Sequence, residues 1–423
     1  MQNTPHDKQR LARFIVASGL TNLADGIALL AWAWVASLIT RDALWIASVP
    51  IALRLPWFLF AIPAGIVTDR VDRRLLILAA DLVRVLAFAL AAVVLWAAMP
   101  LPPAVAQGLG QPLLFAGLML AALVVGVAEV FRDTAAQTLV PSLVPDGMLE
   151  RANGRLWAVE MVANAMLGPA VAALLIGWFV AAPFAVNTVS IALAVWLLAG
   201  IRGAFRARPR GQRDRWQVEL AEGFGFLRAA RTLRLLAWIT GFWNLTFEMV
   251  MIALILHAQE RIGLSAFAYG LVLAGGALGG VAGSIAAERI IRRIGPARAM
   301  QIAMVVSAVS FLGLGLAPGA VTLALVLGFS EFWGLVWNTV SVSFRQRAVP
   351  DLLRGRVNSL YRMLAWGMMP LGMFISGLTM RLAEPALGRE AALLLPFWLA
   401  AGIMAAASFV AWHKLAAGFA QRG

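Results

Sequence analysis

Long apolar segments alternate with short polar ones along almost the whole chain. A membrane-spanning helix needs about 20 mostly apolar residues, and twelve stretches reach that length. They cover residues 12–39, 44–67, 75–98, 112–138, 152–180, 182–201, 232–257, 266–287, 297–317, 319–343, 357–380 and 391–413. The pattern predicts an all-α membrane protein with twelve transmembrane helices. Two of the segments, 152–180 and 357–380, begin in polar sequence, so we expect their first turns to lie partly outside the membrane.

The composition points to hydrocarbon as the surrounding solvent. The chain is 61% hydrophobic and 13% charged, whereas soluble domains average about 45–50% apolar and about 25% charged residues. The first apolar run is longer than the core of a signal peptide, so we expect it to stay in the membrane. The absence of cysteine excludes disulfides and thiolate chemistry. The three histidines, His6, His257 and His413, are far apart in sequence, and no metal site is expected.

The net charge of +14 is distributed as in a membrane protein. When the twelve segments alternate across the membrane, about 27 of the 35 basic residues fall on the side of the N-terminus. Only Arg41, Arg261, Arg381 and Arg389 fall on the other side. This positive-inside pattern predicts a cytoplasmic (inner) membrane protein with both termini in the cytoplasm. Membrane lipids are expected partners of the basic charge, and nucleic acid is not.

The longest polar segment, residues 202–231, divides the chain in the middle. From Trp216 to Leu236 the apolar residues recur at helical spacing, which predicts an amphipathic helix on the membrane surface. A solvated linker that merely joins two bundles is the alternative. The predicted organisation is an N-terminal six-helix bundle over 1–201, a cytoplasmic linker over 202–231 and a C-terminal six-helix bundle over 232–423.

Short motifs recur in the same order in the two halves. A charged turn from Gly65 to Arg74 has a weaker copy between Gly283 and Arg293. Three further motifs have their counterparts: Gly19-x-x-Asn22-Leu23 with Gly241-x-x-Asn244-Leu245, Gly126-x-x-Glu129 with Gly328-x-x-Glu331, and Val144-Pro145-Asp146 with Val349-Pro350-Asp351. Matches in one order indicate a parallel duplication, an arrangement found in one large class of transporters.

The turn from Gly65 to Arg74 resembles the signature between helices two and three of the major facilitator superfamily: Gly, three residues, Asp-Arg, then a basic pair. The family pattern usually has Gly where this chain has Asp72, a departure common in the branch of siderophore and macrolide exporters. Segments 144–153, 222–227 and 355–358 also look like that branch, and the resemblance covers essentially the whole chain. It implies two pseudo-symmetric six-helix bundles and secondary active transport by alternating access.

The same turn is the first candidate for a conformational latch. The resemblance implies that Asp69 holds the two halves together when the cytoplasmic side is closed. We expect Gly65 to permit close packing, and Arg70, Arg73 and Arg74 to anchor the turn to the cytoplasmic face. The alternative is a basic loop that only orients the chain in the membrane.

The fifth apolar segment contains Asn164-Ala-Met-Leu-Gly168-Pro169-Ala-Val-Ala172-Ala173. It resembles the antiporter motif of superfamily exporters, with Gly168 and Pro169 matching and Asn164 replacing a glycine. Small residues let helices approach closely, and Pro169 kinks the helix. The motif favours efflux, and the alternative is an ordinary kinked helix at a packing contact.

Ionisable residues at membrane depth are costly and are functional candidates by default. Asp25 lies in the middle of the first segment beside Asn22, with no basic residue close in sequence, and it suits proton uptake and release. An ion pair, a cap or a solvated site are the alternatives. Glu248 lies at nearly the equivalent depth in the second half, and Glu331 repeats Glu129 without a nearby Arg. Arg54 is a candidate to bind an anionic substrate or a carboxylate of another helix.

Two further sets of charges share helix faces. Glu129, Arg132 and Asp133 lie at i, i+3 and i+4, which predicts a self-neutralising network, with a proton relay or a contribution to the latch as alternatives. Asp81 and Arg84, at i and i+3, are expected to pair.

The chain shows no catalytic constellation and no phosphate-binding loop. An enzyme and a resident cofactor are therefore not expected, and a proton gradient is the expected source of energy. The leading hypothesis is a transporter, functional as a monomer, that exports a bulky organic small molecule, drug-like or siderophore-like, in exchange for protons. A lysophospholipid or other lipid transporter, a non-transporting membrane scaffold or sensor, and an uptake permease are the alternatives.

Overall fold

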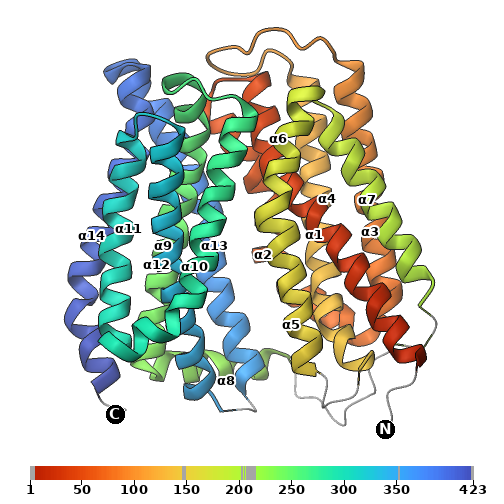
Figure 1. Ribbon diagram of the computed structural model, residues 1–423, viewed down its shortest axis with the longest axis vertical. Helices are drawn as coiled ribbons and strands as arrows, with labels where there is room; N and C mark the ends of the chain where they lie inside the picture. Colours follow the sequence, from red (N-terminus) through yellow and green to blue (C-terminus); the bar gives the residue numbers. More distant parts are fainter. Residues whose placement is uncertain are drawn as a thin grey trace. The chain divides into compact units, whose positions relative to one another are not determined.

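The computed structural model describes residues 5–144, 149–201, 203, 205, 216–350 and 353–420. Over these residues the fold is built from helices, with a long loop between α3 and α4 (Figure 1). Twelve of the described helices are long and apolar enough to cross a membrane, as the hydrophobic pattern predicts. The protein is therefore a multi-pass membrane protein.

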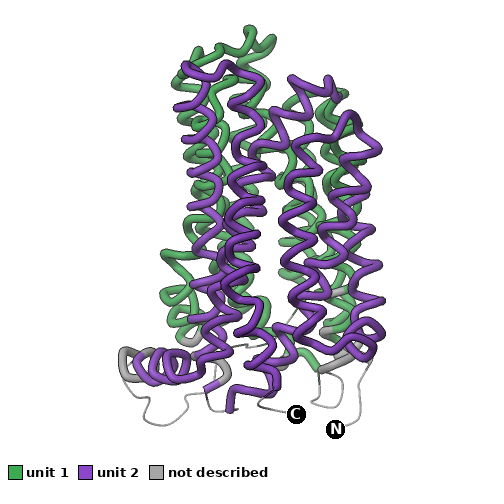
Figure 2. Tube along the Cα trace, turned by 90° about the vertical axis from the view of Figure 1, so that its left-hand side faces the viewer, with its two compact units in different colours: residues 1–209, 265–274 green, residues 210–264, 275–423 purple. Residues whose placement is uncertain are grey.

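The chain forms two compact units (Figure 2). Unit 1 contains Met1–Pro209 and Ser265–Ala274, and unit 2 contains Arg210–Leu264 and Gly275–Gly423. Residues 265–274 therefore belong to unit 1, whereas the chain on either side of them belongs to unit 2. The domain boundaries at 201 and 232 stay a prediction.

In unit 1, several of the later helices pack around α1, the first helix of the chain. Its elements are α1 (Pro5–Ile39), α2 (Ala43–Arg70), α3 (Arg73–Ala97), α4 (Pro112–Leu139), a 3₁₀ turn (Val140–Ser142), α5 (Leu149–Glu160), the π-helical segment η3 (Met161–Leu167), α6 (Gly168–Trp178) and α7 (Ala182–Ala199). Helix α1 packs against α6 and α7, and α3 packs against α4 and α7. This packing brings the polar faces of α1, α3 and α4 together inside the unit.

The fifth predicted segment is not one continuous α-helix. Between α5 and α6 the chain widens into η3, in which the N–H of Gly168 bonds the carbonyl of Ala163, five residues back. The next residue, Pro169, has no N–H to donate to an α-helical bond. Such π turns are rare and occur frequently at functional sites. The sequence predicts the kink at Pro169 but not the wide turn before it.

Unit 2 is organised around α9. Its elements are α8 (Trp216–Ala229), α9 (Arg231–Leu256), the π-helical segment η4 (His257–Arg261), the later part of α10 (Ala266–Ile294), α11 (Pro296–Leu316), α12 (Ala320–Ala348), α13 (Arg354–Leu387) and α14 (Arg389–Ala420). Helix α9 packs against α13 and α14, and α11 packs against α12 and α14.

The amphipathic pattern after the linker belongs to two helices rather than one. Helix α8 ends at Ala229, and Ala230 has a non-helical conformation with φ −79° and ψ 86°. Leu233 and Leu236 are buried and lie in α9. The apolar spacing continues across this break, so the sequence alone does not reveal it. Residues 206–215 of the predicted linker lie outside the described residues.

Candidate functional site

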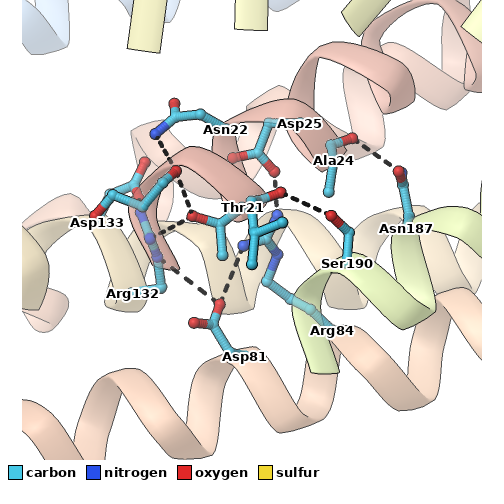
Figure 3. Close-up of polar contacts among 12 residues, drawn as sticks. Thr21, Asn22, Ala24, Asp25, Asp81, Arg84, Arg132, Asp133, Asn187 and Ser190 are labelled. Atoms are coloured by element: carbon cyan, nitrogen blue, oxygen red, sulfur yellow. Dashed lines mark hydrogen bonds and ion pairs between the residues drawn. The ribbon is translucent and has the colours of Figure 1, made fainter. Parts of the chain in front are cut away.

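A cluster of buried charges lies at the centre of unit 1 (Figure 3). Asp25 on α1 forms an ion pair with Arg84 on α3. Arg84 also bonds Asp81 one turn away, with 3.1 Å between Nη1 and Oδ1. The side chains of Arg84 and Asp81 are fully buried, and that of Asp25 is 15% exposed. The pairing of Asp81 with Arg84 is confirmed, and Asp25 is a member of an ion pair.

Arg132 on α4 extends the cluster toward a third aspartate. Its Nη1 lies 2.8 Å from Oδ1 of Asp133, and its Nε lies 3.8 Å from Oδ1 of Asp81. Its Nη2 donates to the hydroxyl of Thr21 on α1 at 2.5 Å. The two arginines therefore link α1, α3 and α4 through Asp81. We call Asp25, Asp81, Arg84, Arg132 and Asp133 the unit 1 charge cluster.

Helix α7 holds the segment of α1 that carries Asp25. Asn187 donates to the carbonyl of Ala24 at 2.9 Å, and Ser190 donates to the carbonyl of Leu20 at 3.2 Å. Asn22 donates within α1 to the carbonyl of Ser18 at 2.8 Å. Since two side chains of α7 bond α1 on either side of Asn22, the position of Asp25 is fixed by backbone contacts as well as by its ion pair.

The helix-five motif packs directly beside Asp25. A Cβ placed on Gly26 would lie 2.8 Å from Cα of Asn164, and one placed on Gly168 would lie 2.9 Å from the N of Ile27. Real Cβ atoms do not approach so closely, so both glycines are needed for this crossing. The π segment η3 ends at this contact, with Pro169 immediately after it. The motif thus places an irregular helix against the residue next to Asp25.

Glu129 and Arg54 adjoin the unit 1 charge cluster. Both are half-buried, and their charges attract each other, while Asp25, Asp133 and Arg84 also act on Glu129. Pairing with a carboxylate of another helix is one of the two roles that the sequence suggests for Arg54. Together these described residues contain four carboxyl groups and three guanidinium groups: Asp25, Asp81, Glu129 and Asp133 against Arg54, Arg84 and Arg132. Fully ionised, the set carries one uncompensated negative charge, which is costly away from water.

The charged turn between α2 and α3 ties together helix ends of unit 1. Arg73 donates to the carbonyl of Thr138 at 3.0 Å, and Arg74 donates to the carbonyls of Leu198 and Ala199 at 3.0 and 2.6 Å. These carbonyls belong to the last turns of α4 and α7, where cations are favoured. Arg73 and Arg74 therefore hold the ends of α4 and α7 to the start of α3, while their anchoring to the cytoplasmic face stays a prediction.

Other residues of the turn give less support to a latch. Arg70 is exposed, and the side chain of Asp69 lies outside the described residues. A Cβ placed on Gly65 would meet no atom within 4 Å among the described residues of its unit, so close packing at Gly65 stays a prediction. The latch between the halves stays a prediction.

Asp72, the residue that departs from the superfamily signature, has a clear structural role. Its Oδ1 accepts from the N–H groups of Arg74 and Leu75 at 3.0 and 3.2 Å, which caps the first turn of α3. Its Oδ2 accepts from the N–H of Phe205 at 2.7 Å. Asp72 therefore joins the start of α3 to the chain that follows α7.

The candidate acids of unit 2 are arranged differently. Glu248 on α9 and Glu331 on α12 are half-buried, and their negative charges act on each other. Nearby on α9, Trp243 stacks on Phe247 with ring centres 4.9 Å apart and donates to Ser307 at 3.0 Å. In unit 2 the two carboxyl groups repel each other, whereas in unit 1 the acids also interact with arginines.

The sequence did not reveal the partners of Asp25 and Arg132 on other helices. Thr21 precedes Asp25 by one helical turn, so both lie on one face of α1, and this spacing is the available signal. Asp81 and Arg84 are likewise one turn apart on α3. Which of these faces meet depends on helix packing, which local spacing does not encode.

A family described as transmembrane secretion effector, within the major facilitator superfamily, matches residues 2–417. The chain is 25% identical over 387 residues to the multidrug efflux pump Tap of Mycobacterium bovis (strain BCG / Pasteur 1173P2), covering 86% of this chain and 85% of the pump. The same values hold for the multidrug efflux pump Tap of Mycobacterium tuberculosis (strain ATCC 25618 / H37Rv).

Solved structures of transporters share the fold. The POT family transporter PepTSo has a TM-score of 0.72 at 12% identity, over 100% of both chains. A bacterial homologue of the iron transporter ferroportin in an inward-facing state has a TM-score of 0.69 at 16% identity, over 96% of this chain and 100% of that one. At these identities the likeness shows the major facilitator fold alone.

Proposed function

Because the chain belongs to the transmembrane secretion effector family of the major facilitator superfamily, we propose that it exports a bulky organic small molecule in exchange for protons by alternating access. Membership in the family makes it a transporter rather than an enzyme. The observation that carries the proton-coupled part of the proposal is the excess of carboxyl over guanidinium groups in and around the unit 1 charge cluster.

A single proton would balance that cluster. With all groups ionised, the four carboxyl and three guanidinium groups leave one negative charge in a membrane interior, where an unpaired charge is expensive. Uptake of one proton neutralises the set. Asp25 is the first candidate for this proton, because its side chain is 15% exposed while Asp81 is fully buried. Its ion pair also joins two helices, whereas the more exposed Asp133 pairs with Arg132 of its own helix.

Protonation of Asp25 would weaken its ion pair with Arg84 and so loosen α1 from α3. Helix α1 also crosses the π segment η3 at Gly26, one residue from Asp25. A change in the Asp25 pair therefore acts at a point where α1 meets an irregular helix. In the proposed cycle, proton uptake permits the inward switch, and substrate loading with proton loss restores the outward state. Glu248 and Glu331 are the next candidates for the coupling proton.

The class of substrate rests on relatives and on the helix-five motif. The Tap proteins are named multidrug efflux pumps, and Gly168 and Pro169 match the motif typical of superfamily exporters. Both favour outward transport of organic compounds. A drug-like or siderophore-like molecule is therefore the proposed cargo, and the cytoplasmic membrane, with both termini inside, is the proposed location.

The test is proton flux through the purified protein in liposomes. Under an imposed pH gradient, lipophilic cations, macrolides and siderophores are added in turn, and the internal pH is followed for wild type, Asp25→Asn, Glu248→Gln and Glu331→Gln. We expect at least one compound to stimulate proton flux in the wild type, and Asp25→Asn to abolish that flux. Binding of the same compound, measured by tryptophan fluorescence, shows whether the mutant retains its site.

The other outcomes are equally informative. Flux that persists in Asp25→Asn and is lost in Glu331→Gln or Glu248→Gln would move the coupling site to unit 2. Transport of a compound without any proton movement would refute proton coupling and leave the transporter assignment intact.

A further inference from the structure

A wide groove runs between α11 and α14 on the surface of unit 2. Its volume is about 900 Å³, at the upper end of the range of about 300–1,000 Å³ typical of pockets that enclose a whole ligand. Small residues line it along α14, at Ala401, Gly402 and Ala405. They are followed by Phe409, which is 85% exposed. Since both helices are membrane spans, the groove faces hydrocarbon rather than water.

The groove is built by the helical spacing of small and large residues. On α14, Trp398, Ala401, Gly402 and Ala405 follow one another at i, i+3, i+4 and i+7, so they share one face. The small side chains leave a depression in the middle of this face, and Trp398 and Trp412 lie at its two ends. The fourteen helical steps from Trp398 to Trp412 span about 21 Å, which is enough to cover the roughly 15 Å of one leaflet of a 30 Å hydrocarbon core.

Basic side chains gather at the Trp412 end of the groove. His413 lines it, and Lys414 follows Val410 by one turn of the same face. Arg298 on α11 precedes Val305 by two turns and is exposed. The side chain of Gln301 donates to the carbonyl of Trp412 at 2.7 Å, which holds the two helices together at this end.

No acidic residue offsets these cations along the two helices that form the groove. The sequence has no Asp or Glu between 296 and 316 or between 391 and 420. The groove therefore joins an apolar channel of leaflet length to a cationic end. That combination matches an anionic glycerophospholipid, which has apolar chains attached to a negatively charged phosphate.

We propose that this groove binds one anionic glycerophospholipid of the surrounding membrane. An acyl chain lies over Ala401, Gly402 and Ala405, and the phosphate lies between Arg298 and Lys414. A second copy of the chain fits less well, because a two-fold interface here would bring the same cations of both copies together. The proposal does not depend on which compound is transported or on whether protons are coupled.

The test uses the whole protein reconstituted in vesicles of equimolar phosphatidylglycerol and phosphatidylcholine. The protein is extracted in mild detergent, and native mass spectrometry counts the phospholipids that remain bound. We expect one tightly retained phosphatidylglycerol on the wild type, with a preference over phosphatidylcholine of at least about tenfold, since each cation near an anionic headgroup contributes to binding.

Three variants separate the groove from the general surface. Ala405→Trp fills the channel, and we expect it to lower the retained lipid at least about fivefold. Arg298→Gln combined with Lys414→Gln should leave a lipid bound but remove the preference for phosphatidylglycerol. Leu325→Trp, at a site on α12 that is 69% exposed and outside the groove, is the matched control and should behave as wild type.

Three results would overturn the proposal. The first is equal retention of phosphatidylglycerol by wild type and Ala405→Trp, and the second is a preference that survives loss of both cations. The third is a wild-type dimer that becomes monomeric in Ala405→Trp, which would identify the groove as an interface between copies. Size-exclusion profiles and circular dichroism confirm that each variant is folded. The combined variant Arg298→Gln and Lys414→Gln provides a test even where Ala405→Trp fails to fold.

Discussion

Asp25 on α1 and Arg84 on α3 form an ion pair inside unit 1, although 59 residues separate them in sequence. Arg84 shares its guanidinium with Asp81, and the two oppositely charged groups on α3 are completely buried. Buried ion pairs are a weak source of stability because desolvation offsets their attraction. A pair that stabilises little and yet occupies the centre of a helical bundle is better explained by function than by folding.

Removal of Arg84 alone should be more damaging than removal of Arg84 together with Asp25. Arg84→Gln leaves Asp25 without its guanidinium partner and Asp81 with only its longer contact to Arg132, and we expect a loss of about 3–5 kcal/mol in the free energy of unfolding. Asp25→Asn combined with Arg84→Gln removes one of the stranded charges and should recover part of that loss. Denaturant unfolding in detergent micelles, run as a double-mutant cycle, measures the coupling. Additive effects of the two substitutions would show that the pair does not interact.

A second prediction concerns Asp72, which caps α3 and also binds the N–H of Phe205. Asp72→Ala removes both sets of bonds, and we expect a loss of about 1–2 kcal/mol from the missing cap alone. Asp72→Asn keeps an acceptor oxygen and is the matched control, with an expected loss well below that of alanine. Thermal unfolding of the three proteins in one detergent compares them. Equal stability of the alanine variant and wild type would refute the capping role.

The outcome for these residues shows what local sequence can predict. Twelve spans follow from apolar length, and the pairing of Asp81 with Arg84 follows from their spacing on one helix. The pairing of Asp25 with Arg84 does not, because it depends on which faces of α1 and α3 meet. The same holds for Arg132 and Thr21. Spacing within a helix identifies the charged faces, and only packing assigns their partners.

The two irregular backbone segments could also not be predicted from the sequence alone. The motif from Asn164 to Pro169 predicts a kink, but the π turn depends on how the chain accommodates the missing N–H of Pro169 against α1. The break at Ala230 is hidden because the apolar spacing continues through it. In neither case does the local pattern alone predict the observed backbone conformation.

A third prediction tests the anchoring of the turn between α2 and α3. Arg74 reaches two carbonyls at the end of α7 with two different nitrogens, and a lysine ammonium on its flexible stem cannot reproduce this planar fork. We expect Arg74→Lys to lower the free energy of unfolding by about 1–2 kcal/mol, since two charge-assisted bonds are weakened. Arg289→Lys, at an exposed site of α10, should have no measurable effect. A similar change in both variants would contradict the anchoring role.

The last prediction separates two glycines of the fifth span. Gly168 lies against Gly26 and Ile27 of α1, whereas a Cβ on Gly177 would meet no described atom within 4 Å. Gly177→Ala should therefore be neutral or stabilising by up to about 1 kcal/mol, because alanine lowers the entropy of the unfolded chain. Gly168→Ala must push α1 away from η3, and we expect a loss of at least about 1–3 kcal/mol, as for other overpacked sites. Because Gly26 adjoins Asp25, the same shift should also lower proton flux in liposomes, while Gly177→Ala keeps it. Wild-type stability and flux in Gly168→Ala would show that the close crossing of α1 and the fifth span is not required.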